Sequence, residues 1–141
     1  MSQESTTPDL VERTRLAFEA WNRVDLDGTL KDFAPDAAWD AVPLGLSFEG
    51  AAAIRSFLAD WRSTYEEYEI EPQEIRHLGN GVVLAVVSQI TRLVGSTTRT
   101  RMREAWAFVF AWIDGTIVRV AAYSDIDAAR AAAERLAEER G

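Results

Sequence analysis

The chain has 141 residues, of which 48% are apolar, and its 15 basic and 23 acidic side chains give a net charge of −8. This length suits one domain over residues 1–141 whose core needs no disulfide or metal to support it. Cysteine is absent and histidine occurs once, which excludes cysteine nucleophiles and multi-histidine metal sites within the chain. The acidic balance argues against nucleic acid as a partner, and no apolar run approaches the ~18 residues of a membrane span. We therefore expect a cytoplasmic protein that binds neither nucleic acid nor a membrane and needs no metal or other cofactor.

Helical spacing, β-branched runs and turn residues predict the elements in chain order. Residues 1–7 are polar and acidic, which favours a disordered tail. Asp25 and Asp27 suggest calcium, but their loop lacks the third oxygen ligand and the distal glutamate, so we favour a capped turn. Four helices are predicted: one that Thr7 caps and that runs through Trp21, a short one that ends at Phe33, one after Gly50, and a last one that Asp125 caps. The predicted strands are 37–42, 68–78, 82–93, 98–113 and 117–123, and residues 45–50 are predicted to form a loop. Pro72 marks the strand 68–78 as an edge strand or a bulged one.

Three segments resemble the SnoaL-like branch of the nuclear transport factor 2-like superfamily. They are residues 17–36 (AFEAWNRVDLDGTLKDFAPD), the Phe48–Gly50 entry into AIRSFL, and Trp112–Val118 ahead of Tyr123–Asp125. The branch includes polyketide cyclases. The resemblance implies an α+β fold, a cone-shaped barrel in which a curved antiparallel sheet wraps on helices. It transfers function poorly, because one scaffold of this kind serves cyclases, isomerases, hydrolases and binding modules.

The catalytic sets of this superfamily are not complete in the chain. Where related steroid isomerases carry a tyrosine and two acids, the resemblance places Ala17, Ala41 and Phe108. Where the cyclases carry a histidine and an aspartate, it places Phe108 and Ala122, and the epoxide hydrolase positions fall on Val87, Gln89 and Ala122. None of these side chains exchanges a proton readily, so no known catalytic set is intact.

One face of the strand 98–113 carries bulky aromatic residues, and the fold that the resemblance implies would turn this face toward the helices. We expect an aromatic cavity there for a small apolar molecule that is flat or polycyclic. The alternative is a filled core, since aromatic residues facing a helix pack more often than they line a pocket. The expected substrate-binding residues are Trp21, Trp39, Trp61, Gln89, Trp106, Phe108 and Phe110.

Two carboxylates are the candidate catalytic residues. Asp40 lies next to the base position of the isomerases, although strict alternation turns Trp39 inward and Asp40 toward solvent. Glu104 shares the aromatic face, where partial burial would raise its pKa, although arginines at the sheet rim offer it ion pairs instead.

These features leave two functional hypotheses open. The first is a cofactor-independent cyclase, isomerase or hydrolase that moves one proton on a polyketide-, steroid- or terpenoid-like ligand. The second is a non-catalytic ligand-binding or dimerisation module of the same fold. We also expect a homodimer that forms through the sheet, because the second face of the strand 98–113 is a stripe of small apolar residues: Ala105, Ala107, Val109 and Ala111.

Overall fold

The computed structural model describes residues 9–95 and 101–141. The expected tail (1–7), the expected cap Thr7 and the expected strand start at Thr98 lie outside these residues. The elements are α1 (Leu10–Asn22), α2 (Leu26–Thr29), β1 (Phe33–Ala41), a 3₁₀ turn (Val42–Leu44), β2 (Leu46–Glu49), α3 (Ala51–Ser63), β3 (Tyr65–Gly79), β4 (Val82–Leu93), β5 (Met102–Ile113), β6 (Thr116–Tyr123) and α4 (Ile126–Glu139).

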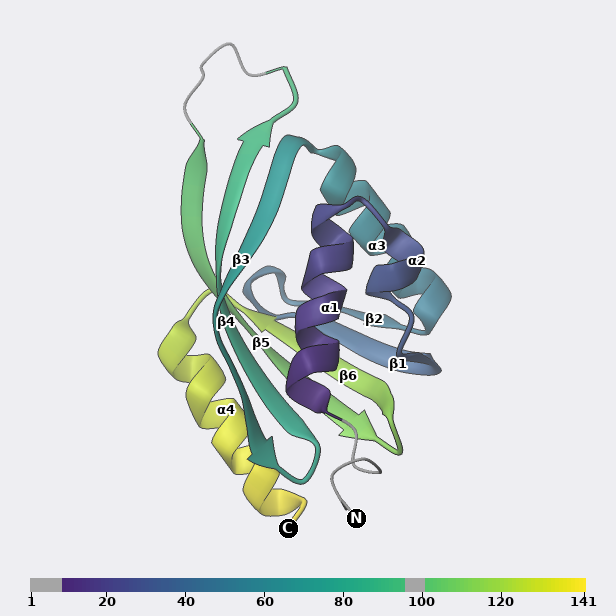
Figure 1. The fold of residues 1–141 in the computed structure, drawn as a ribbon, viewed down its shortest axis with the longest axis vertical. Helices are drawn as coiled ribbons and strands as arrows, with labels where there is room; N and C mark the ends of the chain where they lie inside the picture. Colours follow the sequence, from purple (N-terminus) through teal and green to yellow (C-terminus); the bar gives the residue numbers. More distant parts are fainter. Residues whose placement is uncertain (1–8, 96–100) are drawn as a thin grey trace, which may run out of the picture.

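The strands form one curved sheet in the order β2-β1-β6-β5-β4-β3 (Figure 1). Adjacent strands run antiparallel except β1 and β6, which run parallel, so the sheet is mixed. The α+β class and the curved sheet wrapped on helices are confirmed. The sheet is open, because its edge strands β2 and β3 do not pair with each other.

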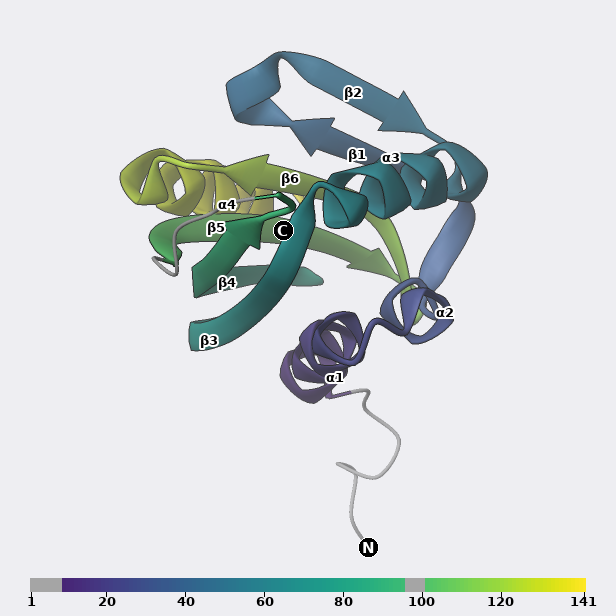
Figure 2. The ribbon, with the colours of Figure 1, turned by 90° about the horizontal axis from the view of Figure 1, so that it is seen from above.

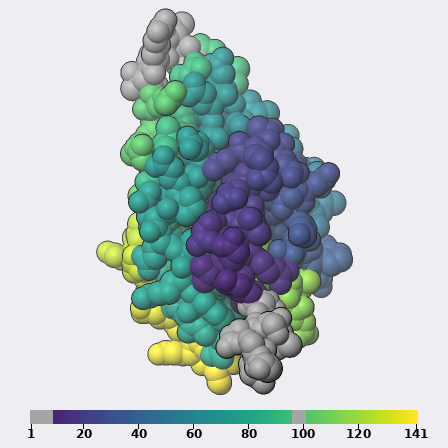
Figure 3. Space-filling view, viewed as in Figure 1, coloured from purple at the N-terminus to yellow at the C-terminus, as the bar shows by residue number. Residues whose placement is uncertain are grey.

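The helices lie on both faces of this sheet. Figure 2 shows α1, α2 and α3 on the concave side, and α4 on the other side against β4 and β5. In the space-filling view α1 packs between the long strand β3 and the segment that contains α2 and β1 (Figure 3). The apolar stripe of α3 explains its place, since Ile54 and Leu58 are buried against the sheet. The core therefore lies between α1, α3 and the concave face.

Aspartates begin the helices. Asp9, rather than a residue before it, caps α1 by accepting a hydrogen bond from the Glu12 backbone N–H at 3.1 Å. Asp25 caps α2 by accepting from the Gly28 N–H at 2.9 Å, which confirms the capped turn. Asp125 caps α4 in the same way, as the sequence predicts. Each carboxylate satisfies one of the N–H groups that a helix start leaves free.

The first strand and the segment after it differ from prediction. The strand β1 begins at Phe33 instead of residue 37, and its pairing with β6 is irregular between Phe33 and Ala38, so the strand tolerates Pro35. The predicted loop 45–50 contains β2, which pairs with β1 because Gly45 at φ 66° reverses the chain. The edge position of β3 and an irregularity at Pro72 are both confirmed.

Three residues of the small apolar stripe of β5 (Ala107, Val109 and Ala111) are buried within the chain, whereas Ala105 is exposed. Ala107 is 0% exposed and Val109 is 6% exposed, and both belong to a second apolar cluster with Ala129 and Ala133 of α4. Alanines on both sides allow the helix to approach the sheet closely. This part of the stripe therefore needs no second copy to cover it, and a homodimer through the sheet stays a prediction. Among the described residues, none of the helices has the length and apolar character needed to cross a membrane.

Candidate functional site

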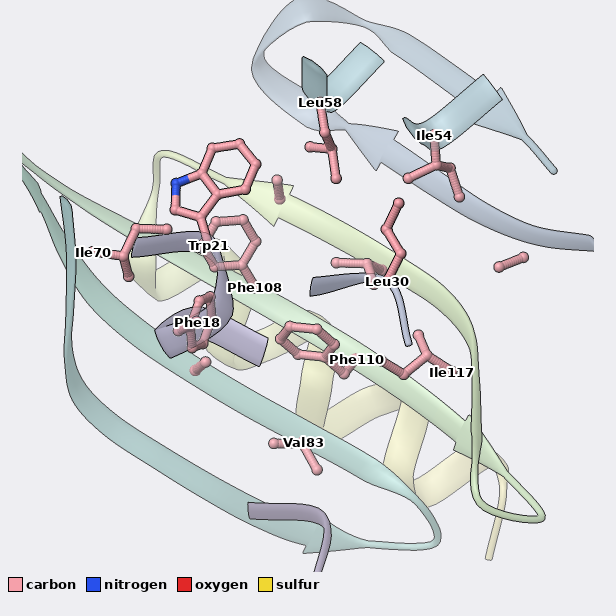
Figure 4. Packing of buried hydrophobic residues seen from close by; sticks show 14 of the residues in the cluster. Phe18, Trp21, Leu30, Ile54, Leu58, Ile70, Val83, Phe108, Phe110 and Ile117 are labelled. Atoms are coloured by element: carbon pink, nitrogen blue, oxygen red, sulfur yellow. The ribbon is translucent and has the colours of Figure 1, made fainter. Parts of the chain in front are cut away.

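A cavity lies between the helices and the concave face of the sheet. About 800 Å³ of space lies between its walls when the open solvent at its mouth is included, and about 90 Å³ of this space can hold the centre of a water molecule. Helices α1 and α3 form one side of the cavity. Figure 4 shows the side chains of Phe18 and Trp21 (α1) beside Phe108 of β5, and Leu58 of α3 on the side of the helices. Its walls consist of Ala17, Phe18, Trp21, Thr29, Phe33, Trp39, Ala41, Pro43, Leu44, Phe57, Leu58, Trp61, Tyr68, Ile70, Gln89, Trp106, Phe108, Phe110 and Ala122.

All seven residues that we expected to bind a substrate line this cavity: Trp21, Trp39, Trp61, Gln89, Trp106, Phe108 and Phe110. They come from α1, β1, α3, β4 and β5, so the curvature of the sheet is what brings them together. That they contact a ligand stays a prediction.

The filled-core alternative holds for part of this region. The Phe18 and Phe108 rings lie 5.7 Å apart, and both side chains are buried in the main apolar cluster. Trp39 packs on Phe108 at 6.1 Å, while Trp39, Trp61 and Trp106 are only partly buried. Core packing thus forms the floor of the cavity, and the less buried tryptophans form its walls.

A buried hydrogen-bond chain crosses one wall. The indole N–H of Trp61 donates to the Tyr68 hydroxyl at 2.9 Å, and that hydroxyl donates to the Gln89 amide oxygen. Gln89 is only 3% exposed. Burial raises the pKa of Tyr68 far above its ordinary value, so the phenol is neutral at physiological pH. The sequence analysis missed Tyr68, although its alternation with Ile70 on β3 could have placed it on the inner face.

Two further indole N–H groups near the cavity are buried without a partner among the described residues. They belong to Trp21 and Trp39, which lie on opposite walls. Because an indole nitrogen only donates, the polar character of these walls is that of a hydrogen-bond donor.

The two candidate catalytic carboxylates lie outside the cavity walls. Asp40 faces the outer side of β1, where it accepts hydrogen bonds from Ser47 at 2.6 Å and from the Arg119 guanidinium at 2.8 and 3.0 Å. Strict alternation along β1 thus holds: Trp39 has the inward place, and Asp40, a candidate catalytic residue, faces outward and does not line the cavity.

Glu104 lies on the inner side of the sheet but beyond the cavity. It pairs in register with Gln89, so the two share a face, yet its side chain is exposed and does not line the walls. Burial raises the pKa of Tyr65, and the negative charge of Glu104 raises it further, so the Glu104 carboxylate lies near the Tyr65 hydroxyl. The rim arginines Arg101 and Arg103 pair with acids of β3 instead.

The positions that carry catalytic groups in the resembling isomerases and cyclases line the cavity, whereas Val87, one of the epoxide hydrolase positions, does not. Ala17, Ala41, Phe108 and Ala122 stand at these places, and no side chain that is charged at neutral pH is among the wall residues that the structure describes. Such walls can enclose an apolar molecule and donate hydrogen bonds to it. They hold no group that takes up a proton near pH 7.

Comparisons with known proteins agree with this fold. A structure of a nuclear transport factor 2-like protein of unknown function from Burkholderia pseudomallei is similar with a TM-score of 0.73 and 20% identity over 86% of this chain and 95% of the other. TerC, co-crystallised with polyporic acid, is similar with a TM-score of 0.69 and 21% identity over 88% of this chain and 97% of the other.

A candidate polyketide cyclase from Sinorhizobium meliloti has 26% identity and a TM-score of 0.64 over 86% of this chain and 99% of the other. None of the curated proteins matches the chain. The family model of the SnoaL-like domain matches residues 14–120, a segment that contains every predicted cavity residue. The chain therefore belongs to the SnoaL-like domain family, on a nuclear transport factor 2-like fold.

Proposed function

We propose that this domain binds a small, largely apolar ring compound between α1, α3 and the concave face of the sheet. The observation that carries the proposal is the cavity itself, whose walls are aromatic and aliphatic apart from one buried polar chain. Pockets with this make-up suit ring systems, because aromatic walls offer large contact areas and the few polar groups fix orientation. A polyketide-, steroid- or terpenoid-like compound has this chemistry.

Two structural neighbours support this ligand class. TerC was co-crystallised with polyporic acid, and the Sinorhizobium meliloti neighbour is described as a candidate polyketide cyclase. The apolar residues at the family's catalytic positions favour binding over proton transfer as the activity of this chain.

Titration with indane, a small fused-ring hydrocarbon, tests the proposal. Four of the five tryptophans line the cavity, so binding will change the tryptophan emission excited near the red edge of their absorption, where indane itself is transparent. We expect a saturable change in the wild type. In the Ala17→Phe variant the added ring occupies the cavity, and the affinity for indane should fall about tenfold or more, the equivalent of ~1.4 kcal/mol.

The matched control is Glu19→Phe, which adds the same ring to the exposed side of the same helix. This variant should bind indane as the wild type does. Saturable binding that survives Ala17→Phe unchanged, with both variants folded by circular dichroism, would place the site elsewhere and refute the proposal.

A second candidate function is proton transfer by Glu104 on a substrate held at the mouth. The register of Glu104 opposite Gln89 favours it, since a ligand that extends from the cavity would meet this carboxylate. Turnover of a ligand that the protein retains would then fall at least ~10²-fold in Glu104→Gln, while Asp40→Asn would retain activity. Equal turnover in the wild type and Glu104→Gln would leave binding as the function.

A further inference from the structure

Gln89 is the polar side chain that β4 contributes to the cavity wall. Its neighbours along the inner face of β4 are Val87, which is fully buried, and Thr91, which is 2% exposed. An amide that is 97% removed from solvent loses the hydrogen bonds of water, so each of its polar atoms needs a partner from the protein or a ligand.

The hydrogen-bond chain satisfies one end of this amide only. Tyr68 donates to the amide oxygen, and Trp61 donates to Tyr68 in turn. Because the Tyr68 oxygen already accepts the indole N–H, its own proton is directed to Gln89. No other described side chain or backbone group hydrogen-bonds the Gln89 amide, so its nitrogen retains two donor hydrogens.

We propose that Gln89 determines which ring compounds the cavity accepts, by donating its amide N–H to an oxygen acceptor on the ligand. Tyr68 is the positioning residue, because its hydroxyl hydrogen-bonds the amide oxygen of Gln89 and so leaves the amide nitrogen for a ligand in the cavity. The inference deepens the proposed function and rests on it. The ligand class is a neutral apolar ring compound with an acceptor oxygen on its edge.

The described wall residues argue against two other kinds of ligand, namely a charged one and one whose polar group only donates hydrogen bonds. The wall residues include no cation to neutralise a carboxylate and no anion to hold an amine. The unpartnered indole N–H groups of Trp21 and Trp39 add further donors to the surroundings. A ligand whose polar group only donates would add a further unpaired donor to these walls, and the free-energy cost of removing that donor from water would not be offset by a hydrogen bond.

Two probes that share a skeleton test the proposal. 1-Indanone carries a carbonyl oxygen where indane carries a methylene group, so they differ in the acceptor alone. Titrations followed by heteronuclear NMR give both dissociation constants and report the side-chain amide signals of Gln89. Each affinity is corrected for the solubility of the probe in water. We expect the corrected affinity for indanone to exceed that for indane roughly three- to tenfold, which is the effect of one neutral hydrogen bond.

The Gln89→Met variant should reduce the ratio of the indanone affinity to the indane affinity to the value that the solubilities of the two probes predict, and this ratio is the readout whether or not the indane affinity itself changes. Gln73→Met, at an exposed glutamine of β3, is the matched control and should leave the preference intact. Where Gln89→Met alone does not fold, the double variant with Tyr68→Phe removes both partners of the buried hydrogen bond and avoids an unpaired hydroxyl.

Tyr68→Phe alone distinguishes positioning from packing. A positioning role predicts that the ratio of the indanone affinity to the indane affinity falls in this variant, because the amide is then free to rotate. A purely structural role predicts that both affinities change together. Equal corrected affinities of the two probes in the wild type, or a preference that survives Gln89→Met, would overturn the inference and leave the proposed function standing. Failure of both probes to bind would refute the proposed function and this inference together.

Discussion

Tyr68 is the cavity residue whose ionisation the fold changes most among those described. Burial raises the pKa of its phenol, whereas the same phenol in the unfolded chain ionises near pH ~10. Its contribution to stability is therefore constant below about pH 10 and declines as the pH rises above it, because only the unfolded state then releases the proton.

Chemical denaturation at pH 8 and pH 11 checks this behaviour. The wild type should lose more unfolding free energy between the two conditions than Tyr68→Phe, which has no proton to release at this site. Tyr65 contributes a similar decline, but it does so in both proteins. An equal loss in the two proteins would show that the Tyr68 hydroxyl ionises as readily in the folded state as in the unfolded state.

At individual positions the sequence was informative where alternation along a strand was regular. Gln89 and the aromatic side chains of β5 lie on the predicted face, because β4 and β5 pair without interruption over this stretch. Tyr68 was missed because its strand is interrupted at Pro72 and weakly alternating. Whether Glu104 lines the cavity stayed open in the sequence, because alternation predicts its face of the sheet but not where along β5 the cavity ends.

The packing of α4 on β5 makes the Ala107→Arg substitution a test of the fold rather than of a dimer. Ala107 is fully buried under α4, so a guanidinium there would be both oversized and unpaired. We expect a loss of about 3 kcal/mol or more of unfolding free energy. Thermal unfolding at several protein concentrations measures it.

The matched control is Ala105→Arg, two residues earlier on the same face, where the side chain is exposed. This variant should stay within about 0.5 kcal/mol of the wild type. If Ala107→Arg instead remained as stable as the wild type and halved the mass measured by light scattering, β5 would be a dimer interface and the described packing of α4 would be wrong.

Among the elements, long strands and capped helices could be predicted and short paired segments could not. The bounds of β4 match the prediction because its β-branched run begins after Gly81 and ends two residues before Gly95, and both glycines have positive φ. The strand β2 has four residues between two glycines, a pattern that local sequence does not separate from a loop. The packing of α4 on β5 is a contact between segments that are distant in the sequence, and the spacing of apolar residues within one segment does not predict it.

At the scale of the whole molecule, the family fold and the cavity depend on the curvature of one open sheet. The strands β3, β4 and β5 extend together past the helices, and the walls collect side chains from α1, α3, β1 and β5 (Figures 1 and 2). Alanine or phenylalanine stands at each position where the resembling isomerases and cyclases carry a catalytic group. None of these side chains takes up a proton near pH 7, in keeping with the proposal that this chain binds a ligand without proton transfer.

Indole N–H signals in a heteronuclear NMR titration with indane test the central claim most directly. The chain has five tryptophans, and Trp21, Trp39, Trp61 and Trp106 line the cavity while Trp112 does not. Arg13 covers the Trp112 ring at 4.8 Å, at the end of β5 away from Trp106. We predict that the four cavity signals shift along one saturable isotherm and that the Trp112 signal stays in place. Indane that shifts none of the four, or that shifts Trp112 as strongly as the others, would contradict a ligand site between the helices and the sheet.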